Sequence, residues 1–195
     1  MTPGIPHWRE IVEFWFGAPG SPERGVPRKA WFEKSAEFDA AIRERFAALL
    51  DAAAAGRLAT WTRTPLAALA LVIVLDQFPR NMYRGTPRAF ATDSRALEIA
   101  LGIVERGFDA AYLPVERAFA YLPFEHAEDI AMQRRSLALF ARLPPSSTSA
   151  SYMDYARRHH DVIERFGRFP HRNEILGRAS TRAELEFLAQ PGSSF

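Results

Sequence analysis

The stretch LAALALVIVLDQF, residues 66–78, is apolar around the whole helix circumference until its last turn. A helix that is hydrophobic on every side is buried, so this stretch predicts a central helix that other elements surround. Thr64 and Pro65 favour a helix start in front of it, and Pro79 predicts that the helix stops at Phe78. We expect the fold to be organised around this helix.

The segments on both sides of the central helix are helical in pattern, and none alternates convincingly in the manner of a strand. Apolar residues at three- and four-residue steps, together with proline and glycine stops, predict helices over residues 7–16, 29–55, 65–78, 93–106, 115–121, 125–143, 152–166 and 181–189. We predict an all-α fold of about eight helices in antiparallel hairpins, in a single domain spanning residues 1–195.

Composition excludes several classes of protein. The 195 residues include no cysteine, which rules out disulfides, thiolate metal sites and a cysteine nucleophile. The longest apolar run, residues 66–75, is about half of the ~20 residues that a membrane span needs. Residues 1–16 lack the basic start and apolar core of a signal peptide. These features predict a cytoplasmic protein with no membrane association.

Motifs for several chemistries are missing from the sequence. It contains no GxSxG, P-loop, GxGxxG or HExxH motif, and no Glu-x-x-His pair of the kind that di-iron bundles use. His160 and Glu164 are four residues apart, a spacing that is common by chance. We therefore predict no metal site and no cofactor.

The net charge of +2 conceals an uneven distribution of arginine. Residues 80–95 hold four arginines and one acid, Asp93, while residues 157–182 hold seven arginines and three acids. The rest of the chain carries a net charge of −5. Arginine suits bidentate contact with carboxylate or phosphate, so these arginines either pair with protein acids or bind an anion.

Asp76 interrupts the apolar surface of the central helix. It lies four residues after Val72 and three after Ile73, on the surface predicted to be buried. An unpaired buried carboxylate costs several kcal/mol, so Asp76 needs a partner, most simply an arginine. The pair is either a structural core contact or a device that orients an arginine toward a ligand.

His126 and His159 both fall on apolar stripes of predicted helices. The stripe of His126 comprises Ile130, Gln133, Leu137 and Phe140, and that of His159 comprises Tyr152, Tyr155, Val162, Ile163 and Phe166. On antiparallel neighbours the two histidines would face inward and meet. Taken alone, each histidine is explained as a core residue whose ring nitrogens have hydrogen-bond partners. Together with nearby acids such as Glu125 and Glu128, they predict a polar pocket or a proton-transfer site.

The loop FGRFPHRNEILGRAST, residues 166–181, is the most unusual stretch of the sequence. Its arginines accompany His171, Asn173 and two glycines, and glycine allows a ligand to approach the backbone closely. Clustered guanidinium groups repel one another unless acids or a bound anion neutralise them. Three roles are open for the arginines of this loop. They cap helices and pair with protein acids, they bind an anion, or they form a nucleic-acid surface, which the absence of an RNA-binding fingerprint disfavours. The segment DQFPRNMYR, residues 76–84, has the same order of residue types as this loop: Phe-Pro, then Arg-Asn, then another arginine.

Residues 69–93, 118–133 and 159–181 closely resemble the bacterial family called domain of unknown function 924, as do EFWFG (13–17) and WFEKSAEFD (31–39). The resemblance implies an all-α fold of helix hairpins in the tetratricopeptide-like superfamily, a right-handed helical array. This sequence lacks the tetratricopeptide repeat consensus. The family carries no established activity, so the resemblance implies a fold and no mechanism.

These observations predict a site for a small anionic ligand, built from the DQFPRN, EHAE and FGRFPHRN segments, and leave open whether it is catalytic. The catalytic candidates are His126, Glu128 and His159. The predicted ligand-binding residues are Asp76, Arg80, Asn81, Arg84, Arg165, Arg168, His171, Arg172, Asn173 and Arg178. The alternative is a tetratricopeptide-like module that binds a protein partner without catalysis. A homo-oligomer formed through the aromatic N-terminal helix is compatible with both hypotheses. Convergence of these residues in one pocket favours the ligand site, and dispersal into paired contacts favours the module.

Overall fold

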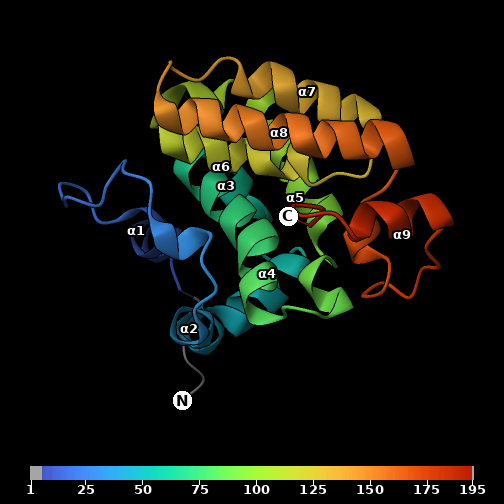
Figure 1. Ribbon diagram of the computed structural model, residues 1–195. Coiled ribbons are helices and arrows are strands. Elements are labelled where there is room, and N and C mark those ends of the chain that lie inside the picture. The colour runs from blue at the N-terminus through green and yellow to red at the C-terminus, as the bar shows by residue number, and fades with distance from the viewer. Residues whose placement is uncertain (1–5, 195) are drawn as a thin grey trace.

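The computed structural model describes residues 6–194, and within that range every regular element is a helix, as predicted. The α-helices are α1 (Trp8–Phe16), α2 (Ala36–Ala54), α3 (Pro65–Val72), α4 (Phe78–Met82), α5 (Asp93–Glu105), α6 (Pro114–Glu125), α7 (Ile130–Phe140), α8 (Ser147–Phe166) and α9 (Arg182–Leu188) (Figure 1). None of the helices in this range combines the length and apolarity that crossing a bilayer requires.

The central helix lies where its composition predicts. Ala68, Leu69 and Ala70 of α3 are fully buried, and α1, α5 and α6 pack against this helix. Aromatic residues complete the core, with Trp15 making edge contacts to Phe78 and Phe119 at 5.7 Å between ring centroids in each case. The helix is surrounded because each of its faces is apolar, so no face is stable in water.

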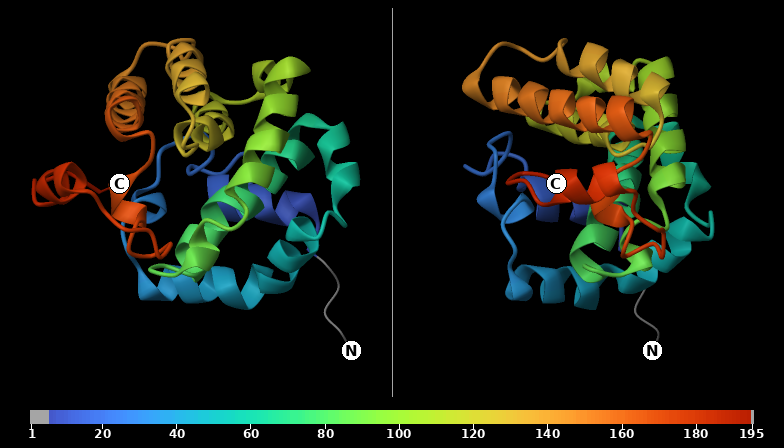
Figure 2. Two further views of the ribbon diagram at one scale, coloured as in Figure 1. Left: turned by 90° about the vertical axis from the view of Figure 1, so that its right-hand side faces the viewer. Right: turned by 45° about the vertical axis from the view of Figure 1, so that its right-hand side comes forward.

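The second half of the chain forms the predicted helix hairpins. α6 packs on α7, and α7 packs on α8, so that three consecutive helices form one layer over the central helix. Figures 1 and 2 show α7 and α8 side by side, with α9 at the edge of the molecule beyond the end of α8. This layer and the turn at the end of α3 hold the residues of the candidate site.

The predicted stop at Pro79 is wrong. The helix continues through a π-helical turn, Ile73–Gln77, into α4, with the Phe78 N–H bonding the Ile73 carbonyl five residues back. Proline has no N–H to donate to the Leu75 carbonyl four residues earlier, and the Thr92 hydroxyl donates to that carbonyl at 2.5 Å. The helix therefore passes the proline because another segment supplies the missing donor. π-helical turns of this kind occur frequently at functional sites.

Thr92→Val tests this account of the proline. Valine keeps the shape of threonine but removes the hydroxyl, so the buried Leu75 carbonyl loses its donor, at an expected cost of about 1–3 kcal/mol in the free energy of unfolding. Thr86→Val is the control, because the Thr86 hydroxyl donates to Tyr83 in an exposed turn where water replaces it. Urea melts that give equal losses for both variants contradict the account.

Two helix starts differ from the predicted positions because serine caps set them. The helix predicted over residues 29–55 begins at Ala36, where the Ser35 hydroxyl accepts from the Phe38 N–H. The helix predicted to begin at residue 152 begins at Ser147, capped by Ser146. A cap satisfies backbone N–H groups at a helix start, which outweighs the hydrophobic pattern at those positions.

The division between the helices predicted over residues 115–121 and 125–143 is also wrong. α6 continues through Pro123 to Glu125, and α7 begins at Ile130, because the Asp129 carboxylate accepts from the N–H groups of residues 131 and 132 at 2.7 and 3.0 Å. His126 is consequently the C-cap of α6. The predicted stripe that joins it to Ile130 and Phe140 does not exist.

Candidate functional site

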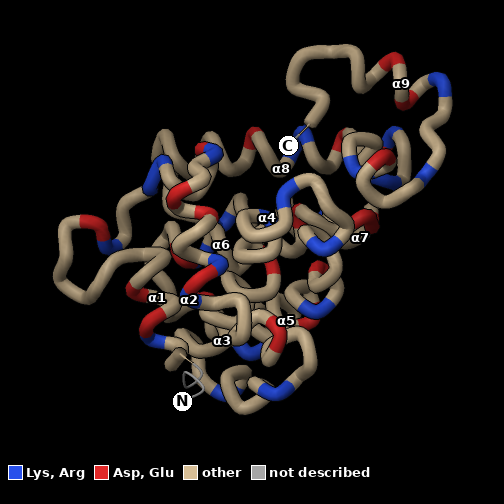
Figure 3. The backbone as a smooth tube through the Cα atoms, turned by 90° about the horizontal axis from the view of Figure 1, so that it is seen from below, with Lys and Arg blue, Asp and Glu red and all other residues tan. Residues whose placement is uncertain are grey.

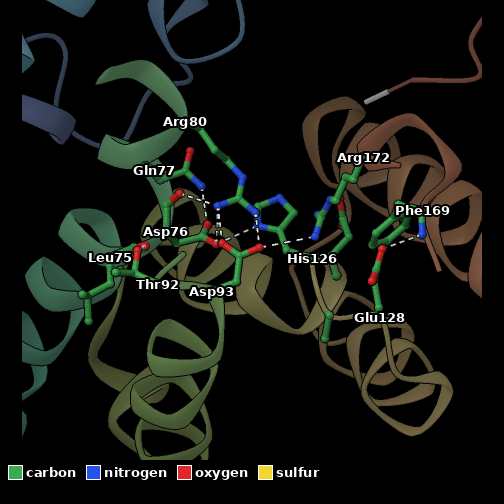
Figure 4. Close-up of polar contacts among 12 residues, drawn as sticks. Leu75, Asp76, Gln77, Arg80, Thr92, Asp93, His126, Glu128, Phe169 and Arg172 are labelled. Carbon is green, nitrogen blue, oxygen red and sulfur yellow. Dashed lines mark hydrogen bonds and ion pairs between the residues drawn. The ribbon is translucent and has the colours of Figure 1, made fainter. Parts of the chain in front are cut away.

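Asp76 is completely buried at the end of the π-helical turn and has three side-chain partners. His126 Nδ1 lies 2.8 Å from Asp76 Oδ1, Arg80 Nη1 lies 3.3 Å from it, and the Gln77 amide donates to Oδ2 at 2.5 Å (Figure 4). The predicted partnership of Asp76 with an arginine is confirmed. The histidine is a second partner, brought to Asp76 from the end of α6.

A second carboxylate, Asp93, joins two arginines from distant parts of the chain. Arg80 donates two hydrogen bonds to it, at 2.8 and 3.0 Å, and Arg172 Nη1 donates a longer one at 3.3 Å. The Arg172 guanidinium lies 4.7 Å from the ring centroid of Phe90 and 4.5 Å from that of Phe169. We call Asp76, Arg80, Asp93, His126 and Arg172 the central cluster.

The central cluster sets the protonation of His126. Burial raises the pKa of Asp76, but His126 and Arg80 outweigh it and hold that pKa well below the usual range. Burial and the charge of Arg80 lower the pKa of His126, against the opposing effect of Asp76. His126 is therefore neutral at pH 7. Because ionised Asp76 only accepts hydrogen bonds, Nδ1 carries the proton, and Nε2 keeps its lone pair.

Glu125 and His159 form a buried pair beside the cluster. Glu125 Oε1 lies 3.2 Å from His159 Nδ1, which also lies 2.9 Å from the Tyr155 carbonyl oxygen. The rings of His126 and His159 lie 6.2 Å apart between centroids. The two histidines do meet, as predicted, but His126 reaches His159 from a helix end and not from a helix face.

The Glu125–His159 pair is uncharged at neutral pH. Burial, with a smaller contribution from the charge of Asp76, raises the pKa of Glu125 to about 8. Burial, and then repulsion from His126 when that ring is protonated, lower the pKa of His159 well below its ordinary value. Glu125 is thus a carboxylic acid at pH 7 and has a proton to donate.

A cavity of about 650 Å³ opens onto these groups between α6, α8 and residues 192–194. Its polar lining includes Gln77, Glu125, His126, Arg158 and His159, and its aromatic lining comprises Trp31, Phe32, Tyr152 and Tyr155. We call it the aromatic cavity. Its size and its mixture of apolar walls with a few polar groups are typical of small-molecule sites.

His126 also lines a second cavity, of about 440 Å³, together with Arg172. Three carboxylates, Asp93, Glu128 and Asp129, line this space as well. Each is engaged within the protein, by arginine or by helix N–H groups. Acids outnumber the one arginine in the lining, so this second cavity is less suited to an anion than the aromatic cavity.

Two further predicted arginines, Arg84 and Arg168, pair with acids of the protein. Arg84 donates to Asp39 at 2.6 and 2.9 Å, beside a 2.7 Å bond from Asn81 to the same carboxylate. Arg168 donates to Glu184 at 2.6 and 2.8 Å. In Figure 3, basic segments of the backbone lie next to acidic ones over most of the molecule. These pairs are dispersed and do not converge on one pocket.

Glu128, a predicted catalytic candidate, holds the 166–181 loop. Arg178 donates to it at 2.6 and 2.9 Å, and the Phe169 N–H donates to it at 2.7 Å. Asn173 accepts from Arg178 at 3.0 Å and donates to Ser180 at 3.0 Å. These bonds fix the loop that carries Arg172 into the central cluster.

The remaining predicted residues are His171 and Arg165. Burial, and then the charge of Arg172, lower the pKa of His171 to about 4, so it is neutral at pH 7. Arg165 is exposed near the end of α8, over the Phe166 ring. His160 and Glu164, with Asp161, bring ligand atoms within 4.8 Å of one another on α8, but two of the three residues are exposed, and such groups are common without a metal.

The two segments that repeat the order Phe-Pro, Arg-Asn, Arg have matching roles. Arg80 of the first and Arg172 of the second both bond Asp93. The later arginines, Arg84 and Arg178, each hold an acid from another element. The repeated order thus marks two segments that converge on one carboxylate.

Sequence reasoning missed several residues of the site. Asp93 carried no signal, because an acid at a helix start ordinarily complements the helix dipole. Glu125 was considered only as an acid near His126. Gln77 and Arg158 reach the aromatic cavity through the packing of separate elements, for which the sequence holds no local signal, whereas Tyr152 lies on the predicted stripe of His159.

Comparison with protein families identifies one family. The sequence matches the family described as "Bacterial protein of unknown function (DUF924)" over residues 11–192. Among solved structures, the protein of unknown function ATU0120 from Agrobacterium tumefaciens is 42% identical, with a TM-score of 0.82 over 93% of this chain and 96% of that chain. No curated protein matches the sequence.

Proposed function

Since this chain belongs to the bacterial DUF924 family, whose description assigns no activity, we propose a function from the site: the aromatic cavity binds a small anionic molecule with a flat apolar part. The observation that carries the proposal is the gathering of Gln77, Glu125, His126 and His159 at one place in a cavity whose walls also include four aromatic side chains. Polar groups with shifted pKa values in a cleft are typical of functional sites.

The charges around the aromatic cavity favour an anion. Arg158 is the charged arginine in its lining, and its guanidinium lies 5.1 Å from the Tyr155 ring centroid. Glu125, the acid in the lining, is protonated at pH 7 because its pKa is raised to about 8. A carboxylate or phosphate therefore meets a guanidinium and hydrogen-bond donors, and it meets no ionised acid among the described residues of the lining.

In this proposal the four charged residues of the central cluster do not bind the ligand directly, and His126 is the member of the cluster that lines the aromatic cavity. The positive charges of Arg80 and Arg172 are balanced by Asp76 and Asp93. Their proposed role is to hold Asp76 ionised, and through it the orientation of His126 at the cavity wall. The proposal therefore assigns anion binding to Arg158 and not to these two arginines. We propose that the protein is a cytoplasmic binding protein.

Thermal melts with benzoate and phenyl phosphate test the proposal, with benzamide as the uncharged counterpart. We expect both anions to raise the melting temperature and benzamide to raise it less, since a ligand that binds the folded state stabilises it. Arg158→Ala removes a charged hydrogen bond worth about 1.5–3 kcal/mol, so affinity for the anions falls about 10- to 100-fold.

The matched control is Arg157→Ala, which removes an exposed arginine one position away on α8, outside the cavity lining. This variant keeps the wild-type response to both anions. Equal shifts in Arg158→Ala and wild type count against the cavity as the anion site.

A tetratricopeptide-like interaction module is the second candidate, and two observations favour it. Most of the arginines predicted to bind ligand are dispersed in paired contacts, and Phe32 and Tyr155 at the cavity are 63% and 46% exposed. Exposed aromatic residues are typical of docking surfaces for peptides. If none of the three compounds changes the melting temperature of the wild-type protein, the result favours this candidate over a small-molecule site.

A further inference from the structure

Two titratable side chains, Glu125 and His126, stand next to each other in the lining of the aromatic cavity. Glu125 is the last residue of α6 and His126 is its C-cap, so one helix end supplies both side chains to the cavity lining. His159 contacts Glu125 at 3.2 Å, and Asp76 contacts His126 at 2.8 Å. Each of the two groups therefore has its own partner, which holds it in place.

We infer that this cavity catalyses keto–enol tautomerisation of a small aryl-substituted 2-keto acid, with His126 as the base and Glu125 as the acid. The inference rests on the proposed binding function and assigns a reaction to the same cavity. It requires no metal, oxidant or second substrate, because the keto and enol forms are isomers.

The atoms and electrons balance within the site. His126 Nε2 takes a proton from the carbon next to the ketone, and the electron pair of the broken C–H bond forms the C=C bond. The C=O π pair moves to oxygen, which takes the proton of Glu125. His126 is left protonated and Glu125 ionised, and exchange of one proton each with water restores both groups.

The lining matches the three parts of such a substrate. The carboxylate suits Arg158, the ketone oxygen suits the Glu125 hydroxyl, and the aryl ring suits the aromatic wall, which comprises Trp31, Phe32, Tyr152 and Tyr155. Aromatic rings prefer offset or edge contacts with other rings, so this wall favours an aryl group over an aliphatic chain.

The protonation states support the same roles. A carboxylic acid kept neutral in an apolar site donates a hydrogen bond to the oxygen on which charge develops, and a neutral imidazole serves as a base. Burial raises the pKa of Glu125 to about 8, and burial lowers that of His126. The groups facing Glu125 are His159 and Asp76, and those facing His126 are Asp76, Arg80, Asp93 and His159.

Exchange of the methylene hydrogens of phenylpyruvate in D₂O, followed by proton NMR, measures the reaction. We expect the wild-type protein to accelerate exchange beyond an equal concentration of free imidazole. Glu125→Gln and His126→Gln each remove one partner of general acid–base catalysis and reduce the rate about 100-fold or more. Arg157→Ala, outside the cavity, keeps the wild-type rate.

Binding is measured separately, from the thermal stabilisation that phenylpyruvate and benzoate give to the same preparations. Wild-type binding without accelerated exchange overturns the inference and leaves the proposed binding function standing. Exchange that both glutamine variants retain also overturns it. Absence of both binding and exchange refutes the proposed function as well. If a glutamine variant does not fold, Glu125→Asp, which retracts the carboxyl group by one methylene, replaces it, and its expected result is the same loss of rate.

Discussion

Asp76→Ala is expected to lower the free energy of unfolding by about 3–5 kcal/mol, a large part of the ~5–15 kcal/mol that stabilises an ordinary domain. Asp76 is fully buried, and its removal leaves His126 Nδ1 and the Gln77 amide without their acceptor. Arg80 keeps Asp93 but loses its second carboxylate. Buried charges and donors without partners are costly because the protein interior cannot solvate them as water does.

The matched control for Asp76→Ala is Asp51→Ala. Asp51 also pairs with an arginine, Arg88, at 2.8 Å, but both side chains are more than half exposed. Such a surface pair contributes about 0–1 kcal/mol. For a domain of this length we expect the melting temperature to fall by roughly 6–20 °C for Asp76→Ala and by a few degrees at most for Asp51→Ala. Similar losses for the two variants refute the central role assigned to Asp76.

Glu125→Gln is expected to remove a pH dependence of stability between pH 5 and pH 8. The pKa of Glu125 is raised to about 8 in the folded protein, mainly by burial, so the folded state holds a proton that the unfolded state releases near the ordinary value. Stability from this group is complete at low pH and is lost as the pH rises toward 8. At about 1.4 kcal/mol per pKa unit, the loss is on the order of 3 kcal/mol.

The measurement is the difference in free energy of unfolding between wild type and Glu125→Gln at each pH. Taking the difference removes the opposite contribution of His126, His159 and His171, whose lowered pKa values destabilise the folded state as the pH falls. Relative to the variant, wild type should be less stable at pH 8 than at pH 5. Glu98→Gln, at an exposed site on α5, should follow wild type throughout. A flat difference for Glu125→Gln shows that Glu125 is not protonated in the folded protein.

Several features were predictable because their causes are local. The apolar circumference of residues 66–75 required burial whatever packed around it. The helix predicted over residues 181–189 starts where expected, because both hydrogen bonds of the Thr181–Glu184 capping box lie within four residues. The need of Asp76 for a charged partner followed from burial alone, and the partner is present.

The helix divisions that failed depended on competition between local signals and distant groups. Pro79 ends no helix because Thr92, thirteen residues later, donates to the Leu75 carbonyl. His126 was placed on the wrong helix, because the Asp129 cap starts α7 after it. In both cases hydrogen bonds to backbone groups outweighed the pattern of apolar residues.

The sequence alone therefore specified the helical class, the buried central helix and the residue types that carry chemistry, because periodicity and burial energy are properties of short stretches. Which acid neutralises which arginine was decided by packing, since an ion pair depends on distance in space and Asp93 meets Arg80 and Arg172 from segments 13 and 79 residues away. The same packing buries Glu125 beside His159 and raises its pKa, which turns an ordinary acidic residue into a proton donor. Most arginines of the two clusters that dominate the sequence pair with protein carboxylates. The aromatic cavity depends on contacts between elements that no local pattern records.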